Sequence, residues 1–215
     1  PSVSGAMVPE PVFTRAGYQA LLEGIYRDLA PLDPAGTLRH EWVNARGCIA
    51  RFDRGTIEIR VIDAQECAAA DVAVCAAVSA AVRALTEERF ASQKAQRAWP
   101  EERLAAILDD TIESADRAVV RDAEYLRCLG WPGRAPCTGG ELWSHLVAET
   151  IAREERAREW MPALETILRE GCLARRILGA LSRERGAGEE IPRPELHEVY
   201  GALARCVAAG ERFAG

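Results

Sequence analysis

Hydrophobic and polar residues alternate from Thr56 to Val61 in one short segment of the chain, TIEIRVI at residues 56–62. A period of two predicts a β-strand. Its odd positions, 57, 59 and 61, carry β-branched apolar side chains, and its even positions carry Glu58 and Arg60. Residues 44–51 predict a second strand, and the short polar connector between the two ends in Gly55. The pattern therefore predicts a β-hairpin.

Helical periodicity dominates the rest of the chain. Before the hairpin, Thr14 is a suitable N-cap for a helix that ends near Leu29. Further on, Thr138 and Glu141 match a capping box. After the hairpin, five helices are predicted, over residues 71–96, 101–129, 138–160, 162–185 and 195–209. The buried face of the first of these five is predicted to consist of Val72, Val74, Cys75, Val78, Val82 and Leu85.

Together these elements predict an α+β protein that is mostly helical, with one N-terminal hairpin followed by a five-helix bundle or array. We expect two parts. Residues 1–70 contain the leading helix and the hairpin, and residues 71–215 form a helical region that packs on them.

Composition narrows the function classes. The net charge of −6 argues against a general nucleic-acid or membrane binder. The alanine-rich run 68–85 is interrupted by Asp71 and Arg83, so no uninterrupted membrane span of about 18 apolar residues is expected. Seven widely spaced cysteines without a CxxC motif indicate neither a zinc site nor a disulfide framework. Reduced thiols fit a cytoplasmic protein.

The hairpin also carries the candidate chemistry. Glu58 and Arg60 share one face of the second strand, while Arg46 and Arg51 lie on opposite faces of the first because they are five positions apart. The register cannot be read from the sequence, so either Arg46 or Arg51 can lie beside Glu58 and Arg60. One interpretation is a solvated face with a weak cross-strand ion pair. The other is a polyanion site, in which arginines hold phosphate and the glutamate holds a metal ion.

The spacing of the whole stretch HEWVNARGCIARFDRGTIEIRVIDAQE, residues 40–66, resembles the carboxylate–amine ligase family of bacterial glutamate–cysteine ligases. The resemblance covers residues 1–90 well and the helical remainder through weaker motifs such as CTGGELW at residues 137–143. It implies a glutamine-synthetase-like catalytic sheet, to which the hairpin belongs. It also implies ATP and Mg²⁺ as cofactors, glutamate or a similar amino acid and an amine such as cysteine as substrates, and a place in glutathione biosynthesis.

The resemblance also implies residue roles. Glu58 is the expected Mg²⁺ ligand, and Arg60 is the expected contact of the transferred phosphate. Arg46 and Arg51 resemble a run that handles nucleotide phosphates and the acyl phosphate, although Ala45 is one residue more than the family pattern has after Asn44. Catalysis is thus expected from Arg60 and Arg46, and ATP or phosphate binding from Arg46, Arg51 and Arg60. His40 and Trp42 receive no role.

One departure from the family concerns the carboxylates that precede the hairpin. None of them forms a strand-borne E-x-E pattern, so we expect the chain to be the C-terminal part of a longer ligase. A homo-oligomer is also possible. The alternative is a non-catalytic helical module for interaction or oligomerisation. The two histidines at positions 145 and 197 are expected at the surface or in packing contacts. The early carboxylates are Glu10, Glu23, Asp28, Asp33 and Glu41.

Overall fold

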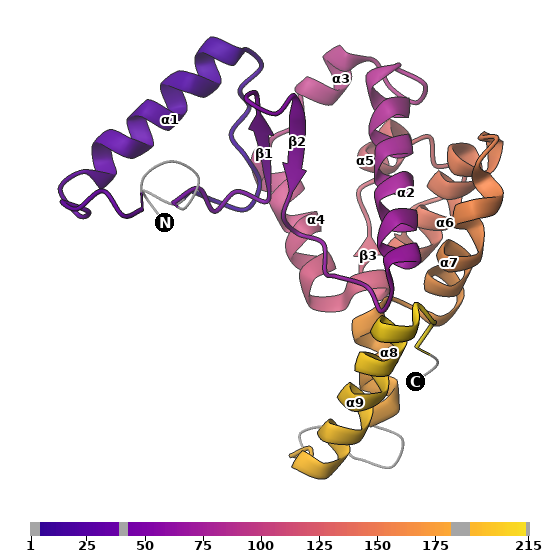
Figure 1. Ribbon diagram of the computed structural model, residues 1–215. Helices are drawn as coiled ribbons and strands as arrows, with labels where there is room; N and C mark the ends of the chain where they lie inside the picture. Colours follow the sequence, from indigo (N-terminus) through magenta and orange to yellow (C-terminus); the bar gives the residue numbers. More distant parts are fainter. Residues whose placement is uncertain (1–4, 39–42, 182–189, 214–215) are drawn as a thin grey trace. The chain divides into compact units, whose positions relative to one another are not determined.

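The computed structural model describes residues 5–38, 43–181 and 190–213 (Figure 1). Contacts between Cα atoms group the chain into two compact units. The first comprises residues 1–63 and 97–109, and the second comprises residues 64–96 and 110–215. Each unit is described by itself.

The first unit contains helix α1, Arg15–Leu29, and the hairpin of β1, Cys48–Arg51, and β2, Thr56–Ile59. Thr14 caps α1 as predicted, since its hydroxyl accepts a hydrogen bond from the amide of Gly17 at 3.1 Å. The helix packs on the hairpin turn through Tyr18, whose ring meets the Phe52 ring edge-on at a centroid distance of 5.8 Å.

The two strands are antiparallel, which confirms the predicted hairpin. Their register determines which residues share each face of the hairpin. Ile49 lies opposite Glu58, and Cys48 lies opposite Ile59. Directly opposed residues share a face of a sheet. The polar positions of β2 therefore share a face with Ile49, and Ile59 shares the other face with Cys48.

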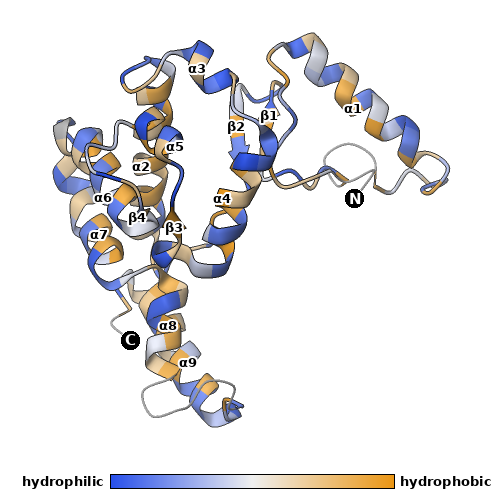
Figure 2. Cartoon of the chain, turned by 180° about the vertical axis from the view of Figure 1, so that it is seen from behind, coloured by the Kyte–Doolittle hydropathy of each residue, from blue (hydrophilic) through white to orange (hydrophobic). Residues whose placement is uncertain are grey.

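The second unit is built on helix α2, Ala68–Thr86, which packs with helices α6, Gly139–Glu149, and α7, Ala157–Glu170. Figure 2 shows the apolar residues of these helices in orange. Their shared core contains alanines from α2 and larger residues from the other segments. The buried members are Ala73, Ala77, Ala80, Val147, Ile151 and Leu164.

The predicted buried face of α2 is wrong in part. Val72, Cys75 and Val82 are exposed, and the buried positions are alanines spaced three and four apart. Alanine brings neighbouring helices close together, whereas Val72 and Val82 are exposed and Val74 and Val78 are half-buried. Residue size thus misled the prediction, because in this helix the smaller side chains form the packed stripe.

Helix α2 is also long and apolar enough to cross a membrane by length and composition. The core helix of a globular domain passes the same test, and the alanines of α2 are buried within the second unit. This helix is therefore weak evidence for a membrane span.

Two predicted helices are shorter than expected. The chain leaves α2 at Glu88, whose φ is 56°, and continues through α3, Gln93–Arg97, and α4, Glu101–Ser114. Ala115, with a φ of 51°, then begins the short 3₁₀ helix η2, Ala115–Arg117. The predicted helix 101–129 is therefore broken, because backbone with positive φ does not continue an α-helix.

The break is followed by a second small sheet that the sequence did not predict. Strand β3, Val119–Val120, pairs antiparallel with β4, Cys137–Thr138. Helix α5, Ala123–Cys128, lies between them in the sequence and is capped by the Asp122 carboxylate. The predicted capping box of α6 is present, since Thr138 and Glu141 bond to each other's backbone amides.

The C-terminal helices also differ from their predicted bounds. Helix α6 ends at Glu149, the 3₁₀ helix η3, Ile151–Arg153, follows, and α7 contains Pro162 instead of starting there. Gly171, with a φ of 91°, separates α7 from α8, Leu173–Leu181. The last helix, α9, Arg193–Ala209, agrees with the prediction and ends at the left-handed Gly210.

The described residues are thus mostly helical, with two small antiparallel sheets, and the predicted α+β class is confirmed at that level. A glutamine-synthetase-like sheet, the division at residue 70 and the homo-oligomer stay predictions.

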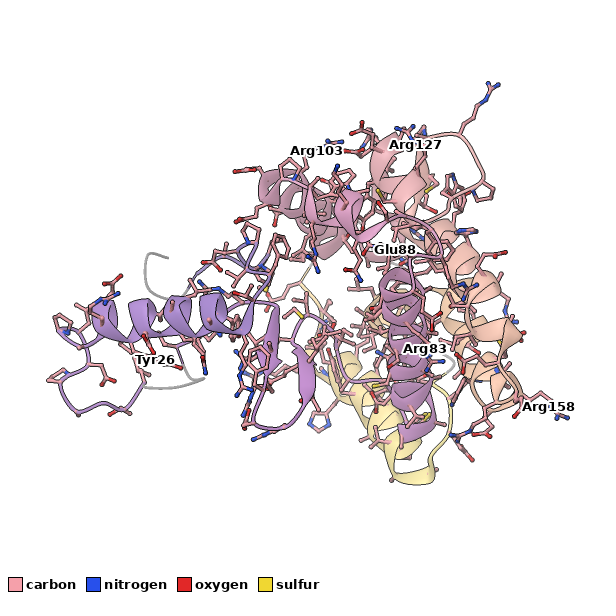
Figure 3. The ribbon with its side chains drawn as sticks, turned by 90° about the horizontal axis from the view of Figure 1, so that it is seen from above. Tyr26, Arg83, Glu88, Arg103, Arg127 and Arg158 are labelled. Carbon is pink, nitrogen blue, oxygen red and sulfur yellow. The ribbon has the colours of Figure 1, made fainter. Side chains whose placement is uncertain are left out.

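Charged side chains lie along the helix surfaces. In Figure 3, Arg158 points away from the chain, and Arg83 on α2 forms an ion pair with Glu154 at 3.0 Å.

Candidate functional site

The polar face of the hairpin carries a row of three charged side chains. The Glu58 carboxylate lies between two arginines: Arg51 Nη1 donates to its Oε2 at 2.9 Å, and Arg60 Nε donates to its Oε1 at 2.8 Å. The register produces this row, because Arg51 is diagonal to Glu58 across the strands and Arg60 is two positions along β2. Of the two predicted arrangements, the described contacts show the one with Arg51 beside Glu58.

Electrostatics keep this carboxylate ionised. The hydrogen bond from Arg60 is the largest effect and lowers the pKa of Glu58. Burial opposes it, and the hydrogen bond from Arg51 with the charges of both arginines adds to the lowering, so the pKa stays below its ordinary value. The Glu58 and Arg60 side chains are about one-third exposed, whereas that of Arg51 is nearly buried. The row therefore presents a permanent negative charge between two permanent positive charges on a partly accessible surface.

Arg60 also ties β2 to the segment before β1. Its Nη1 donates to the backbone carbonyl of Asn44, and its amide donates to the carbonyl of Gly47 at 2.7 Å. The buried Asn44 in turn accepts a hydrogen bond from Arg46 Nη1 at 3.3 Å through its side-chain oxygen. Asn44 thus contacts two of the predicted site arginines, through its backbone and its side chain.

Arg46 is placed differently from the other two arginines. It is only 2% exposed, and Glu10 accepts hydrogen bonds from its Nε and Nη2. This pairing lowers the pKa of Glu10 and raises that of Arg46. Gly5 closes over the same guanidinium with a φ of +82°, and a Cβ there would lie 2.6 Å from the central guanidinium carbon. Arg46 is therefore enclosed by the N-terminal segment.

Glu10 is the residue in this region to which sequence reasoning gave no role. It was counted among the early carboxylates, but nothing local links it to an arginine 36 positions later. Asp33, another of them, is buried and accepts hydrogen bonds from the amides of Thr37 and Leu38, which is a structural role in a loop. Glu23 and Asp28 are exposed on α1. The positions of His40, Glu41 and Trp42 lie outside the described residues.

The row can bind an anion and contribute to a cation site. Arginine guanidinium groups bind phosphate oxygens in a bidentate manner. Mg²⁺ in phosphoryl-transfer sites is held by one or two carboxylates, with water and substrate phosphates completing its shell. Glu58 fits as one such ligand, since each carboxylate oxygen that accepts from an arginine keeps further acceptor capacity. Within residues 5–38, 43–181 and 190–213, no three His, Cys, Asp or Glu side chains form a metal-binding group.

Other titratable groups belong to packing contacts. His145 Nε2 lies 3.2 Å from the carbonyl oxygen of Leu129, and its ring meets Trp131 edge-on at 5.7 Å. This agrees with the predicted packing role. All seven cysteines lie in the described part of the chain, and none of them forms a disulfide there.

A family model and a curated relative match this chain. The family model of glutamate-cysteine ligase family 2 matches residues 5–201. An uncharacterized protein of Archaeoglobus fulgidus is 30% identical over 213 residues, which is 99% of this chain and 48% of that protein. This chain thus spans about half the length of that relative. No solved structure matches the chain. Since the family model covers most of the sequence, the chain belongs to glutamate-cysteine ligase family 2.

Proposed function

We propose that this chain is the phosphate-binding part of an ATP-dependent carboxylate–amine ligase of the glutamate–cysteine ligase type. The observation that supports it best is the Arg51–Glu58–Arg60 row on one strand face. The family match supports a ligase-type enzyme, and the row supplies the residue types that phosphoryl transfer requires.

The proposed reaction has two steps. An oxygen of the substrate γ-carboxylate, from glutamate or a similar amino acid, attacks the γ-phosphorus of ATP, and ADP leaves with the electrons of the broken P–O bond. The nitrogen of an amine such as cysteine then attacks the acyl carbon of the mixed anhydride and loses a proton. Inorganic phosphate leaves and an amide bond remains.

In this proposal Arg51 and Arg60 hold the transferring phosphoryl group. Their positive charge is fixed before the reaction starts, so it stabilises charge that develops on the equatorial oxygens without reorganisation. Mg²⁺ would neutralise phosphate oxygens when bound at Glu58. The contact with Glu58 orients Arg51 and Arg60 toward the same place.

Arg46 stands apart from this pair. A phosphate could reach its guanidinium only by displacing the Glu10 carboxylate, because Glu10 engages both Nε and Nη2. Its predicted catalytic and phosphate-binding roles remain proposals that require this exchange.

Further ligands for the nucleotide and for Mg²⁺ are proposed to come from sequence equivalent to the other half of the Archaeoglobus relative. Thiols without disulfides support the proposed cytoplasmic location.

The experiment is an ATPase and ligase assay on the natural full-length protein. Phosphate release and amide product are measured with ATP, Mg²⁺, glutamate and cysteine, for the unchanged protein and for Arg60→Ala and Glu58→Ala. We expect Arg60→Ala to lower kcat by roughly 10²–10³-fold, as the loss of one transition-state donor does. Glu58→Ala should also lower kcat, because it removes the proposed Mg²⁺ ligand. Arg158→Ala, an exposed arginine on α7, is the matched control and should leave the rate unchanged.

Two results would count against the proposal. One is full activity in Arg60→Ala and Glu58→Ala when both variants retain the far-ultraviolet circular dichroism of the unchanged protein. The other is a lack of ATP-dependent amide formation with any amino acid tested, which would favour the alternative of a non-catalytic helical interaction module.

A further inference from the structure

The segment before α1 fills the place where an anion would bind Arg46. Glu10 accepts hydrogen bonds from Nε and Nη2 of the Arg46 guanidinium. Arginine uses such a pair of N–H groups to bind a carboxylate or a phosphate in a bidentate manner. Arg46 Nη1 donates to the side-chain oxygen of Asn44 at 3.3 Å. The chain therefore supplies its own anion to this buried guanidinium.

Two further contacts close the same segment over Arg46. The Met7 carbonyl accepts a hydrogen bond at 2.8 Å from the amide of Gly47, the next residue after Arg46. Gly5 approaches the guanidinium so closely that a Cβ on it would lie 2.8 Å from Nη2. Gly5, Met7 and Glu10 thus all meet one arginine and its neighbour.

This segment can open without unfolding a regular element. Residues 5–14, all of which the structure describes, form no helix or strand. Segments that lack such backbone ladders open at a lower free energy than helices and strands do. Pro9 and Pro11 flank Glu10 and favour extended backbone, which limits the conformations of Glu10 whether or not it contacts Arg46.

We propose that residues 5–12 form a latch on the anion site at Arg46. With the latch closed, Glu10 occupies the guanidinium, and a phosphate group binds Arg46 only after Glu10 has left it. Glu10 belongs to the same chain, so it competes with phosphate as a ligand of high effective concentration. The apparent affinity of Arg46 for phosphate is therefore reduced in proportion to the fraction of molecules that are open.

The inference rests on the proposed function only in assigning a phosphate group to Arg46, and it adds the regulation of that site. Its test needs no turnover. Phenylglyoxal, which reacts with accessible guanidinium groups, is added to the natural full-length protein, and peptide mass spectrometry measures the modification of each arginine. The unchanged protein is compared with Glu10→Gln, which removes the charge and keeps the size of the side chain.

Arg46 is expected to react about tenfold or more faster in Glu10→Gln than in the unchanged protein, because its competing carboxylate is gone. Inorganic phosphate should protect Arg46 at about tenfold lower concentration in the variant. Arg158, exposed on α7, is the internal control and should react at one rate in every sample. Glu23→Gln, at an exposed position of α1, is the matched variant and should leave Arg46 as slow as in the unchanged protein.

The inference is overturned if Arg46 reacts at the same rate in Glu10→Gln and in the unchanged protein. It is also overturned if Arg46 reacts faster but phosphate protects it no better, or if Glu10→Gln loses the far-ultraviolet circular dichroism of the unchanged protein, since the pair is then needed for folding. The proposed function is affected separately. Protection of Arg46 in a protein that forms no amide would count against the proposed function alone.

Discussion

The carboxylate of Glu10 accepts two hydrogen bonds from the guanidinium of Arg46, although the two residues lie 36 positions apart in the sequence. A backbone contact lies beside this pair, since the amide of Gly47 donates to the carbonyl of Met7 at 2.8 Å. The extended segment before α1 is therefore attached to the first strand of the hairpin. The position of Arg46 depends on a segment far from the motif in which it occurs.

Glu10→Ala should lower the free energy of unfolding by about 1–3 kcal/mol, because it removes the carboxylate that accepts from Nε and Nη2 of the buried Arg46 guanidinium. The Glu10 carboxylate is about one-third exposed, so the lower end of this range is expected. Urea denaturation measures the loss. Glu23→Ala, at an exposed position of α1, should change stability by no more than about 0.5 kcal/mol.

Adding Arg46→Met to Glu10→Ala checks the cause. If the loss of the ion pair is responsible, the double variant should recover part of the stability lost in Glu10→Ala, because the buried positive charge is then removed as well. A double variant that is less stable by the sum of the two single losses would contradict this explanation.

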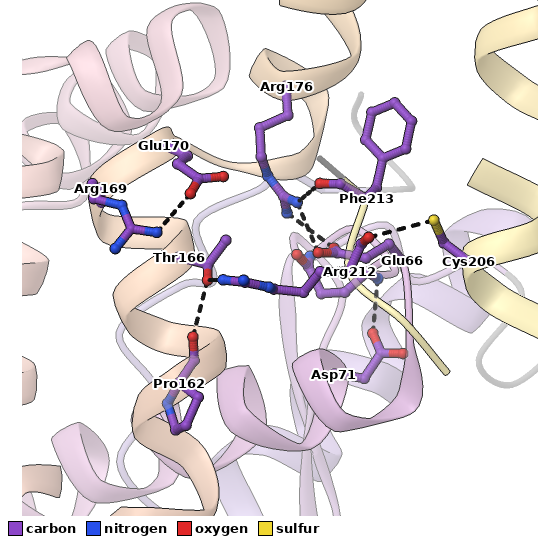
Figure 4. Close-up of polar contacts among 11 residues, drawn as sticks. Glu66, Asp71, Pro162, Thr166, Arg169, Glu170, Arg176, Cys206, Arg212 and Phe213 are labelled. Carbon is purple, nitrogen blue, oxygen red and sulfur yellow. Dashed lines mark hydrogen bonds and ion pairs between the residues drawn. The ribbon is translucent and has the colours of Figure 1, made fainter. Parts of the chain in front are cut away.

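A second long-range pair holds the other unit together (Figure 4). The buried carboxylate of Glu66 accepts hydrogen bonds from Arg176 Nη1 at 2.7 Å and from Nη2 at 2.9 Å. Arg176 Nη1 also donates to the carbonyl of Phe213 at 2.8 Å. Arg176 therefore joins the start of α2, helix α8 and the segment that follows α9.

Arg176→Met should destabilise the second unit by about 3–5 kcal/mol, because it leaves the buried Glu66 carboxylate without the positive charge that faces it. Combining it with Glu66→Met should cost much less, since two apolar side chains of similar length need no counter-charge. Thermal unfolding of the two single variants and the double variant gives the coupling energy. Equal and additive losses would show that the pair does not act as a unit.

The same pair gives a pH dependence. Burial is the largest single effect and raises the pKa of Glu66. The hydrogen bonds and charge of Arg176, together with hydrogen bonds from backbone amides, outweigh it, so that the pKa in the folded protein lies below the ordinary value. The unfolded chain then binds more protons than the folded chain, and stability rises with pH. The contribution is complete above the unfolded pKa of about 4.3 and is lost as pH falls through the lower, folded pKa.

We therefore expect the stability difference between the unchanged protein and Glu66→Gln to be large at pH 7 and to shrink below about pH 4. Urea denaturation at several pH values measures it. A difference that stays constant from pH 7 to pH 3 would mean that Glu66 does not titrate with an altered pKa.

These contacts explain which features the sequence could predict. The hairpin and the capping box of Thr138 and Glu141 were found because each depends on residues within a few positions of one another. Nothing local to Glu66 indicates Arg176, which lies 110 residues away. The pairing of Glu10 with Arg46 was missed for the same reason.

The charged row was partly predictable. Alternation placed Glu58 and Arg60 on one face, but the choice between Arg46 and Arg51 depended on a register that the turn and tertiary contacts set. The buried alanines of α2 show another limit. A periodic stripe of valines resembles a core face, and only the neighbouring helices decide which stripe is covered.

Gly55 provides a test of how the turn controls this register. Its φ is +62°, and a Cβ at this position would meet no heavy atom within 4 Å. Gly55→Ala therefore adds no steric clash with neighbours, and its whole effect should come from the left-handed backbone, about 1–2 kcal/mol. Asparagine tolerates this conformation better, so Gly55→Asn should cost less than Gly55→Ala.

Gly179 in α8 is the matched control, because a Cβ there also meets nothing within 4 Å and its φ is not positive. Gly179→Ala should stabilise the protein by about 0.5–1 kcal/mol, the difference in helix propensity.

Amide hydrogen exchange of β1 and β2 is the measurement for Gly55. Faster exchange in Gly55→Ala than in Gly55→Asn would link the turn backbone to the register that sets Arg51 beside Glu58, since a one-residue slip would move Glu58 to the other face. Equal exchange in both variants would mean that contacts outside the turn determine the register.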